Sequence, residues 1–493
     1  MRQLSHNGII VPGYEARGFS VVFRGETIKL HPQQEEMAVA WVKKLGTDYV
    51  NDPVFVRNFF SDFCKALGVK GSREDFDFSE IENVVTRERE QKLSMGKDDK
   101  KRLAAERKKL REANKEKYGR AVVDGVTVEL GNYIAEPSSI FMGRGKHPLR
   151  GKWKMGAVES DITLNLSPDA PRPTGAWKEI VWMPECMWVA RWDDKLRGRE
   201  KYVWLSDSSF VKQEREMEKF DKAAELGKNY DLLKSNISSS LRSPDVKTRE
   251  IATVCYLIDA LNLRVGDEKD EDEADTVGAT TLTPKNVKID GNVVKFDFLG
   301  KDSVRWQKEV EMPEQVVKNI AEFISQSESV IFDGVRSSDV NDFLSSIVPG
   351  ISAKVFRTYR ASKIVDDYLK KEKVVKDDTD DYKKYVATMA NLQAAIACNH
   401  KRKLPTSWDN VLQKRVDRLN ELKGKKGKKA AERVKAAKLR VKLMKETKDY
   451  NLNTSLKSYI DPRVYLEWCR KVDADWKKYY SKTLQRKFSW IEK

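Results

Sequence analysis

The segment between residues 407 and 448 constrains the fold of this 493-residue chain more than any other stretch. Apolar residues recur there at spacings of three and four on both sides of a lysine-rich centre, which predicts two helices with one thin apolar seam each. The apolar positions are Leu412, Val416 and Leu419, then Val434, Ala437, Val441 and Met444. Glycines within the run Lys423–Lys429 predict a turn. We therefore expect an antiparallel coiled-coil hairpin over 406–448 that returns the chain close to where the segment began.

The overall charge narrows the class of partner. Lys and Arg number 93 against 76 Asp and Glu, for a net charge of +17, which indicates a polyanion, either nucleic acid or an anionic membrane surface. No run of 18 apolar residues and no secretory signal pattern occurs, so we expect an intracellular protein without membrane association. The five cysteines are widely scattered and only four histidines occur, so we expect neither a disulfide framework nor a metal site.

Local patterns predict an α+β fold. Two short apolar runs around Gly25 predict a β-hairpin, and Asp290-Gly291 predicts a turn within a three-stranded meander over 281–311. Charge-rich residues 78–118 predict two solvent-facing helices. Helical periodicity dominates over 213–263 and 313–400, whereas short strands dominate over 121–215. We divide the chain into an N-terminal region 1–212, a core region 213–405, the hairpin 406–448 and a C-terminal domain 449–493.

Three basic side chains stand in contexts that call for an anionic partner. Arg264 follows two leucines at a helix end, Arg357 lies between aromatic residues near a helix start, and Lys301 occupies a predicted hairpin tip. Each has an ordinary alternative: an ion pair of Arg264 with the acidic run 270–273, or a solvated loop position for Lys301. His400 closes an apolar helix, where a capping or core role is the simpler interpretation.

Tyr459 lies in a turn-like segment just after the predicted hairpin. Because a tyrosine hydroxyl has a pKa near 10, it is a poor nucleophile unless cationic groups surround it. A half-buried packing role is the alternative for any one of 16 tyrosines. A second basic segment, Phe141–Arg150, places cations among glycines that let backbone approach a phosphate, although such loops are common. Its cations and those just after it are Arg144, Lys146, Arg150, Lys152 and Lys154.

Five short motifs occur in one order along the chain. They are Leu263–Lys269, Phe296–Ser303, Lys354–Tyr359, Cys398–His400 and Tyr459–Arg463. In these motifs, and in Gly143–Pro148 and Ala274–Gly278, the chain resembles the eukaryotic-type DNA topoisomerase IB family from His6 onward. Several ordered motifs are far more specific than any one alone.

The resemblance implies an ATP-independent isomerase that relaxes positive and negative supercoils by cutting one strand, allowing rotation and resealing. Tyr459 would be the nucleophile that forms a 3′-phosphotyrosyl link, with Arg264, Arg357 and His400 stabilising the transition state and Lys301 acting as general acid. No cofactor would be obligatory, and divalent cations would at most stimulate. The DNA contacts implied are Arg144, Lys146, His147, Arg150, Lys152, Lys154, Thr276, Asp302 and Thr454.

The same resemblance implies a bilobed clamp around duplex DNA. A mixed N-terminal lobe would face a mainly helical catalytic core similar to tyrosine recombinases, followed by the coiled-coil linker and a small helical C-terminal domain. The partner would be supercoiled double-stranded DNA, bound largely without sequence preference by a monomer. Absence of a long basic N-terminal extension favours a compact archaeal nucleoid enzyme, with a nuclear member as the alternative.

Ser458 departs from the asparagine that nuclear enzymes usually carry before the tyrosine, a contact for camptothecin-class drugs. We therefore expect poor trapping by camptothecin. Two other functions remain open on sequence alone: a tyrosine site-specific recombinase, which uses the same residue types, and a non-catalytic basic DNA-binding scaffold.

Overall fold

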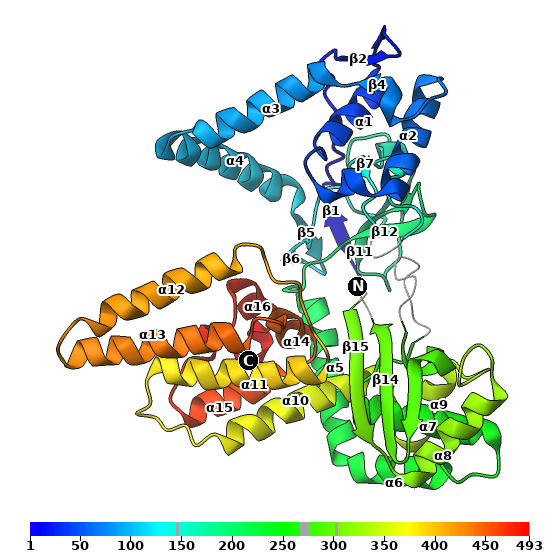
Figure 1. The fold of residues 1–493 in the computed structure, drawn as a ribbon, viewed down its shortest axis with the longest axis vertical. Helices are drawn as coiled ribbons and strands as arrows, with labels where there is room; N and C mark the ends of the chain where they lie inside the picture. Colours follow the sequence, from blue (N-terminus) through cyan, green and yellow to red (C-terminus); the bar gives the residue numbers. More distant parts are fainter. Residues whose placement is uncertain (144–146, 267–276, 301–303, 493) are drawn as a thin grey trace. The chain divides into compact units, whose positions relative to one another are not determined.

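The computed structural model describes residues 1–143, 147–266, 277–300 and 304–492. Within these ranges the chain folds into two compact units, Met1–Lys212 and Gln213–Lys493, which mix helices and strands. Figure 1 shows the elements of each unit. The mixed α and β fold predicted from the sequence is confirmed.

The first elements of unit 1 follow the turn and proline signals. Strands β2 (Ser20–Phe23) and β3 (Glu26–Lys29) pair antiparallel, and the two residues between them have positive φ angles, as a two-residue hairpin turn requires. The strand β4 (Phe76–Asp77) pairs with the other edge of β2. Prolines occupy the first turn of helices α1 (Pro32–Val42) and α2 (Pro53–Leu67), which pack through buried aromatic side chains.

Helices α3 (Ser79–Ser94) and α4 (Lys97–Tyr118) extend away from the strands and helices of unit 1 (Figure 1). Only Ile81 and Val85 of α3 are buried, and no residue of α4 is. The predicted pair of charged helices is confirmed, and Met95 and Gly96 separate them. Their stability comes from helix propensity and local ion pairs rather than from a core.

Short strands complete unit 1. An antiparallel sheet has the order β1 (Leu4–His6), β5 (Arg120–Val123), β6 (Val126–Glu129). A four-stranded sheet has the order β10 (Glu179–Val181), β9 (Thr163–Asn165), β11 (Trp188–Asp194), β12 (Arg199–Trp204), with β10 and β9 parallel. Strands β7 (Ser139–Ile140) and β8 (Trp153–Lys154) form a separate pair. Apolar side chains from both larger sheets share one core.

Unit 2 contains two cores. Helix α5 (Phe210–Lys228) spans the boundary and leads into α6 (Tyr230–Ser240) and α7 (Val246–Leu261). The meander follows as β13 (Val287–Asp290), β14 (Val293–Gly300) and β15 (Val304–Glu311), with Gly291 at φ 59° in the predicted turn. The first core joins these strands to α7, α8 (Glu314–Gln326), α9 (Ser337–Ile347) and the start of α10 (Ala353–Lys371).

The second core of unit 2 gathers the remainder of α10 with α11 (Asp380–Ala397) and the C-terminal helices. These are α14 (Leu452–Ser458), α15 (Pro462–Lys471) and α16 (Lys482–Lys487). Phe220 of α5 is fully buried in the same cluster, where its ring lies 6.5 Å from that of Phe488. Helix α5 is therefore part of the platform on which the C-terminal helices pack.

Helices α12 (Trp408–Lys423) and α13 (Lys428–Glu446) lie side by side, and α13 also packs against α11. The end that joins them extends beyond the other helices of unit 2 (Figure 1). Their bases meet: Lys401 pairs with Tyr450 in a β-bridge, and the Asn451 N–H donates to the His400 carbonyl at 2.7 Å. The two predicted helices, and the predicted return of the chain to its starting point, are thus present.

Candidate active site

Tyr459 is held in a rigid turn between two helices. It follows α14 directly, and its N–H donates to the Ser455 carbonyl at 2.9 Å. On the other side, Ser362 of α10 donates its hydroxyl to the Tyr459 carbonyl at 3.3 Å and accepts from the Asp461 N–H at 2.9 Å. Asp461 caps α15, which begins at Pro462. Both neighbours of the turn are therefore anchored, and the half-buried tyrosine ring has a defined position.

Arg357 lies against the face of the Tyr459 ring. Its guanidinium carbon is 4.8 Å from the ring centroid, a cation–π distance. The side chain is buried in the second turn of α10, and its Nη2 donates to the Cys398 carbonyl at 3.2 Å. Its Nε has no hydrogen-bond partner among the described residues. A buried guanidinium with unused donors is suited to bind an anion.

His400 lies beside the same tyrosine. Asn399 adopts φ 53° just after α11 and turns the chain, and the His400 ring centroid then lies 5.4 Å from that of Tyr459. The imidazole is buried, yet neither ring nitrogen has a hydrogen-bond partner in the described part of the chain. Burial first, and then the charges of Arg357 and Arg264, lower the pKa of His400 to about 3. The ring is therefore neutral at pH 7 and retains one N–H to donate.

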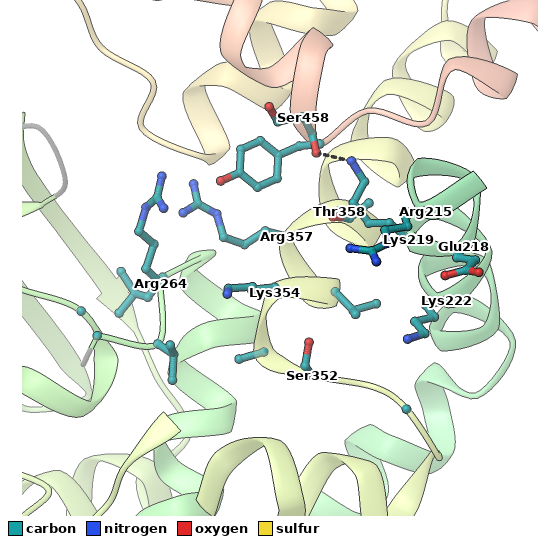
Figure 2. Close-up of a pocket in the computed structure, with 18 of the residues that line it drawn as sticks. Arg215, Glu218, Lys219, Lys222, Arg264, Ser352, Lys354, Arg357, Thr358 and Ser458 are labelled. Carbon is teal, nitrogen blue, oxygen red and sulfur yellow. Dashed lines mark hydrogen bonds between the residues drawn. The ribbon is translucent and has the colours of Figure 1, made fainter. Parts of the chain in front are cut away.

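Arg264 completes a cationic surface around the tyrosine. Asn262 ends α7 in the left-handed conformation, and the Arg264 carbonyl accepts from the Ala279 N–H at 2.8 Å. Arg264 and Arg357 both line a cavity of about 550 Å³ that includes Tyr459, and a smaller one of about 150 Å³ that includes His400. Figure 2 shows the two guanidinium groups close together at the larger cavity. The sequence-predicted residues Arg264, Arg357, His400 and Tyr459 thus come together.

Further cations line the larger cavity that were not predicted to be site residues from the sequence. They are Arg215, Lys219 and Lys222 of α5 and Lys354 of α10, with Glu218 as the one carboxylate among the lining residues described. A signal did exist: residues 215, 219 and 222 recur at helical spacing and share one face of α5. The excess of positive charge suits a ligand that carries several phosphates.

Other predicted residues divide between described and undescribed parts of the chain. Thr454 lines the smaller cavity and Ser458 the larger one. Five predicted residues lie outside the described ranges, so their predicted roles remain predictions. They are Lys301, Asp302, Thr276, Arg144 and Lys146.

The predicted DNA contacts of unit 1 that are described all have internal partners. Arg150 pairs with Asp52 at 3.1 Å, and Lys152 pairs with Asp62 at 2.7 Å, each with about a quarter of its side chain exposed. His147 is buried, and its Nδ1 accepts from the Leu149 N–H at 3.1 Å. Partial exposure leaves Arg150 and Lys152 able to face a phosphate on one side.

Lys154 lies in a different environment from Arg150 and Lys152. Its side chain is only 5 % exposed, and its ammonium pairs with Asp194 at 3.0 Å and Glu136 at 2.5 Å. Burial alone would raise the pKa of Asp194, but hydrogen bonds from Arg197 and Lys154 outweigh burial and lower it to about 2. Lys154 is therefore a buried ion-pair partner, and this burial, which the sequence does not show, does not favour the predicted DNA contact. That contact stays a prediction.

Neither a metal-binding cluster nor a membrane-spanning helix is found among the described residues. No group of three or more His, Cys, Asp or Glu side chains among them is arranged to hold a metal ion. None of their helices is long and apolar enough to cross a membrane.

A half-buried tyrosine beside two arginines and an imidazole that has no hydrogen-bond partner among the described residues is an arrangement suited to phosphoryl transfer. Comparison with known proteins specifies the family. Models of eukaryotic DNA topoisomerase I match in order: the DNA binding fragment over residues 1–205, the catalytic core over 208–433, and the C-terminal topoisomerase domain over 431–493. The chain belongs to the eukaryotic DNA topoisomerase I family.

Similar proteins agree with this assignment. DNA topoisomerase 1 alpha of Arabidopsis thaliana is 36% identical over 536 residues, which cover 99% of this chain and 58% of the relative. DNA topoisomerase 1 of Homo sapiens is 33% identical over 540 residues, covering 99% of this chain and 70% of the relative. The chain thus spans somewhat more than half the length of the plant relatives that it matches.

Proposed function

We propose that this chain is a type IB DNA topoisomerase, which relaxes supercoils of either sign by transient cleavage of one strand. The observation that carries the proposal is the surroundings of Tyr459. Arg357 lies 4.8 Å from its ring, and His400 lies beside it with both ring nitrogens without a hydrogen-bond partner among the described residues. Buried polar groups normally have hydrogen-bond partners. We therefore expect a ligand to supply the missing partners of His400 and Arg357.

The proposed reaction follows from these groups. The Tyr459 hydroxyl loses its proton to solvent as its oxygen attacks phosphorus, and the bond from phosphorus to the 5′ oxygen breaks. The 5′ oxygen gains a proton, for which we propose Lys301 as the general acid. The tyrosine then holds the 3′ phosphate, and attack by the free 5′ hydroxyl reverses both steps. Because one ester replaces another, resealing needs no ATP.

Charge develops on the non-bridging oxygens as phosphorus becomes pentacoordinate. Two guanidinium groups, from Arg264 and Arg357, would neutralise this charge, and neutral His400 would donate its N–H. Burial makes such donors more effective than they would be in water, since they need no reorganisation when the charge appears. The pKa of His400 near 3 supports a hydrogen-bonding role over that of a cation.

The wider architecture is proposed from the family. The two units would act as a clamp on duplex DNA, with a recombinase-like core and with α12 and α13 as a coiled-coil linker that slows rotation of the free duplex. A monomer with a charge of +17 would bind largely without sequence preference and with steep salt dependence. Divalent cations would only stimulate, and the protein would act on the chromosome, in a nucleoid or a nucleus.

The test is relaxation of positively and negatively supercoiled plasmid in EDTA without ATP. Wild type should relax both, and Tyr459→Phe should relax neither while keeping its affinity for DNA. Tyr450→Phe is the matched control, because this tyrosine is close in sequence but lines neither cavity. A folded wild type that binds DNA without relaxing it would support a recombinase or a scaffold. Activity that survives Tyr459→Phe would identify another nucleophile.

A further inference from the structure

The backbone immediately before Tyr459 is held by two lysines from other helices. Lys487 of α16 donates to the Lys457 carbonyl at 2.9 Å, and Lys219 of α5 donates to the Ser458 carbonyl at 3.0 Å. Figure 2 shows the second of these bonds at the edge of the larger cavity. The carbonyls belong to the last two residues of α14, and the Ser458 carbonyl is part of the peptide that joins Ser458 to Tyr459.

One carboxylate holds both ammonium groups. Glu216 Oε1 lies 2.5 Å from Lys219 Nζ and 3.1 Å from Lys487 Nζ. The Lys487 side chain is 9 % exposed and that of Glu216 is 18 % exposed, so water competes little for the contact between them, whereas the Lys219 side chain is 31 % exposed. Burial lowers the pKa of Lys219, while Glu216 opposes the shift. The carboxylate thus fixes two cations that α14 needs.

Helix chemistry explains why the cations lie there. The last carbonyls of a helix have no partner within the helix, and the helix dipole concentrates negative charge at that end. Helix α14 has only seven residues, so it is too short to be stable without outside support. Ser362 anchors the chain after the tyrosine, and the two lysines anchor it before the tyrosine.

We propose that Glu216, Lys219 and Lys487 form a positioning bridge that sets the Tyr459 hydroxyl for in-line attack. The inference rests on the proposed function and names a further part of its machinery. None of the three residues needs to touch the reacting phosphate. They act through the backbone of α14, and a displacement of the nucleophile by about 1 Å can reduce a rate about 100-fold.

Lys219 also lines the larger cavity, so it could instead contact a DNA phosphate. The two roles differ in what they change. A phosphate contact contributes to affinity and to its salt dependence, and its loss reduces the slope of log affinity against log salt by about one. A positioning group contributes to the rate at saturating DNA.

The experiment measures single-turnover cleavage by the full chain on a duplex whose cut fragment dissociates and prevents resealing. Lys219→Met and Glu216→Gln should each reduce the cleavage rate at saturation about 10- to 100-fold. In the Tyr459→Phe background, DNA affinity should stay within about twofold of the parent, and the slope of log affinity against log salt should be unchanged. Lys219→Arg, which keeps a donor to the carbonyl, should recover most of the rate.

The same helix offers a matched control. Glu225 and Lys228 form an ion pair with the same three-residue spacing at 3.2 Å, although it is more exposed to solvent. Neither residue lines either cavity, and no hydrogen bond or ion pair from them to α14 is found among the described residues. Lys228→Met should cleave at the wild-type rate. Combining Glu216→Gln with Lys219→Met should cost less than the product of the single effects, because both act on one bridge.

Three results would overturn the positioning bridge. An unchanged saturating rate with a weaker affinity and a lower salt slope in Lys219→Met would make Lys219 a phosphate contact. A normal rate in Glu216→Gln would show that the carboxylate is dispensable. Failure of Lys219→Arg to restore any rate would remove the carbonyl contact as the cause. Wild type that binds DNA but never cleaves it would instead contradict the proposed function itself.

Discussion

His6 in unit 1 and His400 in unit 2 are both buried imidazoles, and they are treated differently by their surroundings. The Gly8 N–H donates to His6 Nδ1 at 3.1 Å, so His6 Nε2 carries the proton and donates to the Asn165 carbonyl at 3.1 Å. Neither nitrogen of His400 has such a partner in the described structure. Burial lowers the pKa of both rings, to about 4 and about 3. Both rings are buried and neutral at pH 7. They differ in hydrogen-bond completeness and in the charges of Arg357 and Arg264 beside His400.

The buried cations show the same contrast. Lys154 in unit 1 is enclosed by two carboxylates, whereas no carboxylate within ion-pair distance of Arg357 is found among the described residues of unit 2. A cation with its own anions completes the fold, and a cation held only by a carbonyl retains capacity for an external anion. Unsatisfied polarity thus distinguishes Arg357 and His400 from Lys154 and His6.

The largest effect expected from this contrast is on catalysis. Arg357→Gln should reduce the DNA cleavage rate about 100- to 1000-fold, the cost of removing one transition-state donor in a buried site. Because no paired carboxylate is left behind, the thermal midpoint of unfolding should change little. Single-turnover cleavage and thermal unfolding together test this. Loss of stability with a normal cleavage rate would show that Arg357, like Lys154, stabilises the fold and not the transition state.

Lys154→Met should show the opposite profile. It removes a partner of the fully buried Asp194 carboxylate, and breaking a buried pair costs about 3 kcal/mol. The pKa of Asp194 is depressed, so its stabilising contribution is present above the unfolded value near 3.8 and is lost only as pH falls through about 2. Urea unfolding at pH 7 should reveal the full loss. A weaker salt dependence of DNA binding, with normal stability, would instead support the predicted DNA contact of Lys154.

The two histidines provide a smaller, paired test. His6→Leu leaves the Gly8 N–H and the Asn165 carbonyl without partners, which costs about 1 to 3 kcal/mol at pH 7. His400→Leu leaves no such group and should cost less. Equal losses in urea unfolding would remove the distinction between the two sites.

Both histidines also affect the pH dependence of stability. Their folded pKa values lie below the unfolded value near 6.5, so the unfolded chain binds more protons and stability falls as pH decreases from about 6.5. Between pH 7 and pH 5 each ring should account for at most about 2 kcal/mol of that fall. Each leucine variant should therefore have a flatter acid-side profile, measured by urea unfolding at both pH values. A wild-type profile in His400→Leu would contradict a neutral imidazole.

The smallest structural change is expected at Ser458, whose carbonyl, not its side chain, is bound by Lys219. Ser458→Asn keeps that bond, so stability should stay within about 0.5 kcal/mol of wild type. We propose that wild type is poorly trapped by camptothecin and that the asparagine increases trapped nicked product, measured on plasmid gels. Persistent nicks with wild type at ordinary doses, without further increase in the variant, would contradict this.

Much of the fold could be predicted because its signals are local. Turn residues at Gly25 and Gly291, prolines at the starts of α1 and α2, and the spacing of apolar residues in α12 and α13 each act within a few positions. Such signals depend on backbone conformation and helical period, which a single sequence displays. Arg264, Arg357, His400 and Tyr459 were also identified in advance, because the ordered motifs that contain them resemble one family.

Only the tertiary structure decided which polar groups are satisfied. Lys154 resembles Lys152 in sequence, yet the fold brings Asp194, 40 positions further along the chain, to it and buries the pair. Lys219 reaches the Ser458 carbonyl across 239 positions, and no local pattern of residues marks that contact. Hydrogen bonds and ion pairs between distant segments depend on how whole helices and sheets pack. The sequence by itself therefore determined which candidate residues occur and in what order. Only the tertiary structure decided which of them are buried and which have hydrogen-bond or ion-pair partners.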